Sequence, residues 1–180
     1  MGFRRCSSTG RARRVGVVAL CLAAVGIVVP GSAGAGTVVN VQIMDRCDPA
    51  SFNAMFGDVC SVRNSGVPVE QFLARVNPSD FGHSAWRYAP GQIRLKPGQT
   101  LQLNNRGVET HTFTEVASFG GGIIPPLNAV FPPGTPLAVP IGDPRFIPAQ
   151  GQLDVTGLPV GTHLFECLIH PWMQATIQQT

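Results

Sequence analysis

The alternation of apolar and polar positions predicts short β-strands along most of the chain. Period-two patterns recur at 37–44, 93–95, 101–103, 108–116, 153–155, 163–167 and 173–177, with turn residues between them. Roughly seven short strands separated by turns are typical of an antiparallel sandwich. Within 108–116 the same period places His111 and Phe113 on one face of the strand and threonines on the other.

Two segments interrupt the strand pattern. Between residues 45 and 79 the sequence pattern predicts short helices and irregular loops. Ser51 is expected to cap a short helix that ends at Phe56, and Pro68 is expected to begin a second helix. This segment is expected to decorate the sheet rather than belong to it. Residues 117–150 hold eight prolines and five glycines between large apolar side chains, which predicts a long loop that packs on the sandwich.

The first 35 residues have the composition of an export signal. Five arginines precede an apolar run from Val15 to Val29, and the small residues 31–35 follow it. We interpret residues 1–35 as a secretory signal peptide cut after Ala35, because the apolar run is shorter than the about 20 residues of a membrane span. Arg13-Arg14 leaves the general and twin-arginine routes open. Export predicts a periplasmic, cell-envelope or extracellular protein, either free or envelope-associated.

Cleavage of this leader changes the charge of the chain. The full sequence has 13 basic and 10 acidic residues, and the leader removes five of the basic ones, so the formal charge falls from +3 to −2. The basicity therefore belongs to the leader, and nothing predicts a nucleic-acid partner. About 145 residues remain, enough for a domain with its own core. We divide them into an N-terminal strand and extension (36–84) and a β-domain (85–180).

Three cysteines remain after cleavage. Cys47 and Cys60 lie in one turn-rich segment and are predicted to form a disulfide, which would contribute roughly 3 kcal/mol by constraining the unfolded chain. Cys167 is left without a partner. A single thiol in an oxidising compartment needs protection, and a bound metal would provide it.

A thiol, an imidazole and a thioether lie close together near the C-terminus, in the stretch FECLIHPWM (165–173). A strand ends at Cys167, and His170 and Met173 belong to the turn that follows. Thiolate and thioether favour Cu(I), whereas imidazoles also accept Cu(II), so this mixture suits a copper ion that changes oxidation state. Zinc is the alternative metal, disfavoured because a thioether is a poor zinc ligand.

A copper site of the two-histidine, one-cysteine type needs a second imidazole. His111 is the candidate because it lies on a β-rich segment. His163 is four residues before Cys167 on one strand, about 13 Å away, and is too distant to share a metal with it. His83 lies in a Gly/Ser loop. We interpret His163 and His83 as surface or packing histidines, so the predicted ligands are His111, Cys167, His170 and Met173.

In these ligand-bearing segments the chain resembles the cupredoxins. The motif CLIHPWM after GTHLFEC resembles their C-terminal copper loop, in the spacing of amicyanin, and the strand 101–105 leading to His111 resembles the one that delivers their first histidine. The resemblance covers roughly 85–178 apart from the long loop, and implies a cupredoxin-like Greek-key β-sandwich with one mononuclear copper ion. The family often has asparagine after the first histidine to tie the ligand loops together; here Thr112 would do part of that.

Four protein ligands leave no open position for a substrate, so the resemblance implies outer-sphere electron transfer. His170 is expected near the surface as the exit route, and Trp172, with Pro171, either helps to form a docking patch or packs under the ligand loop. Copper enzymes with this domain need additional histidines, often as His-x-His pairs, which this sequence lacks. We therefore expect a monomeric, non-enzymatic one-electron carrier with redox partner proteins. The alternative is a protein that buffers or delivers copper.

Overall fold

The computed structural model describes residues 37–61 and 66–180, so the predicted signal peptide lies outside the described residues. Across the described ranges the elements are, in chain order, β1 (Val38–Met44), α1 (Pro49–Phe56), α2 (Val69–Leu73), η1 (Pro78–Asp80), β2 (Arg87–Ala89), β3 (Gln92–Leu95), β4 (Thr100–Asn105), β5 (His111–Thr112), β6 (Thr114–Val116), η2 (Pro125–Val130), β7 (Phe146–Ile147), β8 (Gln152–Val155), β9 (Gly161–Glu166) and β10 (Gln174–Gln179).

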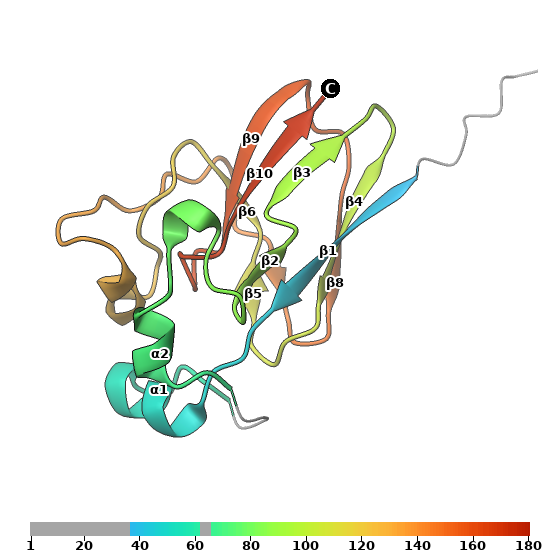
Figure 1. Cartoon of the computed structure of the whole chain (residues 1–180). Coiled ribbons are helices and arrows are strands. Elements are labelled where there is room, and N and C mark those ends of the chain that lie inside the picture. Colours follow the sequence, from blue (N-terminus) through green and yellow to red (C-terminus); the bar gives the residue numbers. More distant parts are fainter. Residues whose placement is uncertain (1–36, 62–65) are drawn as a thin grey trace, which may run out of the picture. The chain divides into compact units, whose positions relative to one another are not determined.

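Two four-stranded sheets within these ranges form the predicted β-sandwich (Figure 1). The first has the order β2-β1-β4-β8 and the second β3-β10-β9-β6, while β5 and β7 form a short separate pair. The sandwich is not purely antiparallel, contrary to the sequence prediction, because β1 pairs parallel with β4 and β3 pairs parallel with β10. Parallel neighbours need long connections, and the helical segment after β1 and the whole chain between β3 and β10 supply them.

The core lies between the two sheets and follows the predicted alternation. On β4, Leu101 and Leu103 are fully buried while the residues between them are partly exposed. Phe113, just before β6, and Phe165 on the neighbouring strand β9 stack in this core, with ring centroids 4.2 Å apart and planes within 9° of parallel. Burial of each such side chain stabilises the fold by about 1.5–3 kcal/mol.

The segment after β1 forms two short helices, as predicted, but is more than a decoration. Its Phe52 and Phe72 are fully buried in the same apolar cluster as the sheet residues. The cap of α1 is Asp48, not Ser51: the Asp48 side chain accepts from the Ser51 backbone N–H at 2.9 Å. The Ser51 hydroxyl instead accepts from the backbone of Val69, at 3.1 Å, and so joins the two helices.

The long loop 117–150 packs on the outer face of the second sheet. Val116, Ala138 and Leu168 form a separate small apolar cluster there. Backbone hydrogen bonds from Ala117 to Val139 (2.7 Å) and from Ile141 to Glu115 (2.7 Å) hold the returning part of the loop beside β6. The predicted packing role is therefore confirmed only for part of the loop. Leu127, Ala138 and Ile147 are buried. Other apolar residues of the loop are more than half exposed: Ile123, Leu137, Val139, Ile141 and Phe146. Within the described residues, no helix has the length and apolar character needed to cross a membrane.

Candidate metal centre

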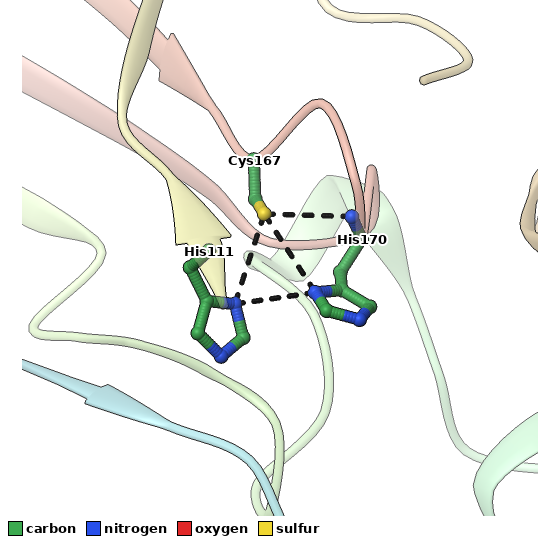
Figure 2. A group of neighbouring side chains, drawn as sticks. All are labelled: His111, Cys167 and His170. Carbon is green, nitrogen blue, oxygen red and sulfur yellow. Dashed lines mark hydrogen bonds between the residues drawn. The ribbon is translucent and has the colours of Figure 1, made fainter. Parts of the chain in front are cut away.

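Three buried donor atoms converge at one end of the sandwich. The Cys167 Sγ lies 3.7 Å from Nδ1 of His111 and 3.7 Å from Nδ1 of His170, and the two nitrogens are 3.2 Å apart. Figure 2 shows the three side chains directed toward one another, His111 from β5 and the other two from the turn after β9. His111 and Cys167 are fully buried and His170 is 2% exposed.

Thr112 ties the two ligand-bearing segments together. Its hydroxyl accepts from the backbone N–H of Leu168 at 2.8 Å, and its own backbone N–H donates to Cys167 Sγ at 3.3 Å. The backbone N–H of His170 is a second donor to the same sulfur, at 3.4 Å. The tethering role expected of Thr112 is therefore present, and the sulfur accepts two fixed hydrogen bonds of the kind that tune a copper–thiolate site.

The ligand turn is closed by its own backbone. Cys167 N–H donates to the Met173 carbonyl and Met173 N–H donates to the His170 carbonyl, both at 2.9 Å. Met173 is fully buried. Outside the turn, the Ile123 N–H donates to the Leu168 carbonyl at 2.7 Å. A side chain at Gly122 would collide with that carbonyl, since its Cβ would lie 2.1 Å from the oxygen. The long loop thus braces the ligand turn from outside.

A carboxylate orients the ring of His111. Asp45, the residue after β1, places Oδ2 2.8 Å from His111 Nε2, and both side chains are completely buried. Burial alone would raise the pKa of Asp45, but its hydrogen bond with His111, the charge of that ring and two backbone N–H donors lower it. The ionised carboxylate therefore accepts a hydrogen bond from the Nε2–H group, which leaves Nδ1 of His111 facing the other two donors.

The three donors shift one another's protonation. Burial disfavours the charged Cys167, but its hydrogen bonds and attraction to His111 and His170 outweigh this and hold the pKa of the thiol well below its usual range. Burial likewise lowers the pKa of His111, yet Asp45 and Cys167 raise it overall to about 9. The pKa of His170 is lowered, mainly by burial and further by the charge on His111. The opposite shifts of Cys167 and His111 have one cause, the attraction between a thiolate and a neighbouring imidazolium.

These distances fit a metal ion. A triangle with sides of 3.7, 3.7 and 3.2 Å has its centre about 2 Å from each corner, close to metal–imidazole bonds of about 2.0–2.1 Å and metal–thiolate bonds of about 2.3 Å. The thiolate, two imidazoles and the neighbouring Met173 are the ligand types of a mononuclear copper site. The donor set fits a type 1 copper centre.

The site is closed on the His170 side, which corrects the expected surface position of His170 and decides between the two alternatives for Trp172. His170 is not near the surface, because the ring of Trp86 lies against it with centroids 4.8 Å apart. Trp172 is fully buried and packs edge-on against Trp86 and Phe72, at 5.2 and 4.8 Å. Pro171 is buried as well. Neither Trp172 nor Pro171 therefore forms a docking patch on this chain: Trp172 packs under the ligand turn.

The remaining predicted residues have structural roles. Cys47 and Cys60 form the expected disulfide. His163 lies on β9 and pairs with Glu115 of β6 at 2.7 Å, away from the donor cluster. His83 is buried against Phe72, with ring centroids 5.3 Å apart, and accepts from the Ala85 backbone through Nδ1.

Two residues of the centre, Asp45 and Trp86, were not identified from the sequence. A signal for Asp45 existed: Val41, Ile43 and Asp45 follow the inward-facing period of the first strand, and an acid at an inward position needs a buried partner. No local pattern points to Trp86, because its contact with His170 joins two residues that are far apart in the sequence.

Comparison with known proteins finds similarity in structure only. No protein-family profile and no curated protein sequence matches the chain. Among solved structures, a purple cupredoxin from Nitrosopumilus maritimus has a TM-score of 0.43 at 11% identity, over 79% of this chain and 99% of that one. A variant of amicyanin in its Cu(I) form and another in its reduced state each have a TM-score of 0.36, at 16% and 17% identity, over 52% of this chain and 73% of theirs. At these values the chemistry of the centre rests on its own geometry.

Proposed function

We propose that this chain is a type 1 copper protein that carries single electrons between redox partners. The observation that supports this most directly is the convergence of Cys167 Sγ and two imidazole nitrogens within 3.2–3.7 Å in a buried site. Bound copper would supply the Cu(I)/Cu(II) couple. The proposed ligands are His111, Cys167 and His170, with Met173 as the axial contact.

The surroundings suit repeated change of oxidation state. The donors are held by strand pairing at β5, by two backbone bonds across the ligand turn and by the Thr112 bridge. Donors that are positioned before the metal binds move little when its charge changes, which favours rapid outer-sphere transfer. The closed packing around the three donors also leaves no approach for a substrate, which supports a carrier rather than an enzyme.

The cap over His170 sets the route that such a carrier would use. An electron leaving through His170 meets the ring of Trp86, which is itself only 1% exposed. We therefore propose that the redox partners act across Trp86 and the ligand turn rather than by touching His170. A disulfide in the extension and the predicted signal peptide support an exported, oxidising location for this exchange.

The test is to add Cu(II) to residues 36–180 and to the Cys167→Ser variant, and to record visible absorption and EPR spectra. We expect an intense thiolate-to-copper band with narrow hyperfine splitting in the wild type and its complete loss in the variant. Thr162→Ser, an exposed hydroxyl change on β9, is the matched control and should keep the band. A weak ligand-field spectrum that survives Cys167→Ser would contradict the proposal.

Copper buffering or delivery is the second candidate, because the donors that would carry electrons would also bind Cu(I). Enclosure by Trp86 and Trp172 would slow release of the metal, which suits buffering better than delivery. The two functions differ in rates. A carrier exchanges electrons rapidly with small redox reagents while holding its copper, whereas a delivery protein passes copper to an acceptor protein faster than to a small chelator.

A further inference from the structure

We propose that Asp45 is a positioning residue of the metal centre, which orients His111 toward the metal and favours the oxidised state of copper through its charge. The inference rests on the proposed copper function and assigns to the N-terminal segment a direct influence on the redox behaviour of the site. The inference is based on the position of the Asp45 carboxylate and on the turn that binds it.

The carboxylate has an unusual environment for a charged group. Its side chain is completely buried, and Oδ2 lies 2.8 Å from Nε2 of His111, itself completely buried. A buried carboxylate needs partners for its lone pairs. Asp45 obtains them from the backbone: Val108 N–H donates to Oδ1 at 2.8 Å, and Glu109 N–H donates to Oδ2 at 2.9 Å.

The turn before β5 is shaped around this carboxylate. A Cβ at Gly107 would lie 2.0–2.3 Å from the carboxylate atoms of Asp45, so no larger residue fits there while the carboxylate keeps its place. Asn105, fully packed at the end of β4, closes the same turn by accepting from Gly107 N–H at 2.9 Å and donating to the Glu109 carbonyl at 2.8 Å. These contacts therefore form a turn whose shape and hydrogen-bond donors fit one carboxylate.

The chemistry of this contact sets the direction of the effect. A carboxylate only accepts, so the proton of the neutral His111 ring stays on Nε2 and the lone pair of Nδ1 points at the metal position. The negative charge also makes the imidazole a stronger donor. In a site shielded from water this charge stabilises Cu(II) more than Cu(I), because the oxidised ion carries the larger positive charge. Asp45 should therefore lower the reduction potential.

The experiment compares wild type with Asp45→Asn, both loaded with copper. The amide retains an oxygen that can accept from His111 but removes the charge. We expect affinity for Cu(II) to fall about 10–100-fold and affinity for Cu(I) to fall less, so the reduction potential rises, by 59 mV for each tenfold difference between the two losses. In the Cu(I) form, the Nε2–H proton of His111 should be slowly exchanging by NMR in the wild type and faster in the variant.

Two further variants separate position from charge and from general damage. Gly107→Ala keeps the charge but displaces the carboxylate, so it should also weaken Cu(II) binding and shift the EPR parameters; it serves if Asp45→Asn does not fold. Glu115→Gln makes the same chemical change at the His163 pair on the sheet edge and should leave the potential unchanged.

The outcomes distinguish this inference from the proposed function. If the wild type itself gives no thiolate-to-copper band, the copper function is wrong and the inference falls with it. If the wild type shows the band but Asp45→Asn keeps the wild-type potential and Cu(II) affinity, the copper function stands and Asp45 is merely structural. Equal potential shifts in Asp45→Asn and Glu115→Gln would likewise overturn the specific role of Asp45.

Discussion

At the scale of single residues, the centre depends on groups that are costly to bury unless each has its partner. The Cys167 thiol, the His111 ring and the Asp45 carboxyl lie in a region closed to solvent, and the pKa of each is shifted by another of the three. The Thr112 hydroxyl is a neutral partner of the same kind. It accepts a hydrogen bond from the backbone N–H of Leu168, a residue that is buried away from solvent.

Thr112→Val tests how much that hydroxyl contributes. Valine keeps the volume but leaves the buried N–H of Leu168 without an acceptor, so we expect the free energy of unfolding to fall by about 1–3 kcal/mol in urea titrations. Thr114→Val is the control: its hydroxyl donates only to that of Thr112 at 3.2 Å, and its loss orphans no backbone group. Equal losses in the two variants would show that the Leu168 contact is not special.

At the scale of elements, the ligands lie on two segments, the short strand β5 and the turn after β9, and the Thr112 hydroxyl joins the two. The strands that continue these segments, β6 and β9, pair antiparallel, and His163 and Glu115 reinforce that pair. Burial lowers the pKa of His163, but its contacts with the Glu115 carboxylate and the Pro159 carbonyl outweigh this and raise it above the ordinary value.

That shift predicts a pH-dependent contribution to stability. A histidine whose pKa is raised by folding stabilises the native state fully below its unfolded value of about 6.5, and loses that contribution as pH rises through the folded pKa. We expect wild type to exceed His163→Gln in free energy of unfolding by up to about 1 kcal/mol near pH 6 and to lose this advantage in the alkaline range. Denaturation curves of both proteins across this range would measure it. A constant difference would contradict the ion-pair interpretation.

At the scale of the whole unit, the N-terminal segment supplies a sheet strand, a carboxylate at the centre and the aromatic side chains that pack against Trp86, the cap over His170. β1 lies between β2 and β4 in the first sheet. Beyond it, Phe52, Phe72 and Trp86 form a continuous aromatic contact that reaches His170. The segments 36–84 and 85–180 therefore share one core.

Removal of residues 36–84 is predicted to prevent folding. A chain of residues 85–180 would lack the partner that both β2 and β4 hydrogen-bond in the first sheet, and it would expose the apolar face of Trp86. We expect poor amide dispersion in ¹H–¹⁵N NMR spectra for 85–180 and a well-dispersed spectrum for 36–180. A dispersed spectrum of the shorter chain would show that the extension is an accessory.

Much of this arrangement follows from local patterns. Period two predicted most strands of both sheets, because the alternation of burial is a property of each strand by itself. It did not predict β2, and it gave one strand over 108–116 where the structure has β5 and β6 in different sheets. The spacing of Cys167, His170 and Met173 predicted a ligand turn for a similar reason, since a strand end and a tight turn bring near neighbours together. His111 could be predicted as the second imidazole ligand by elimination among the four histidines.

Tertiary structure decided what depends on segments distant in sequence. The carboxylate of Asp45 meets His111 across 66 positions of the chain, and the ring of Trp86 meets His170 in the ligand turn, which is also distant in sequence. Burial of Trp172 and His170 was equally beyond local pattern, since an apolar residue in a turn is compatible with either a docking surface or a core. The sequence by itself determined the strands and the metal-ligand types; the fold determined which groups tune the centre and which side of it is closed.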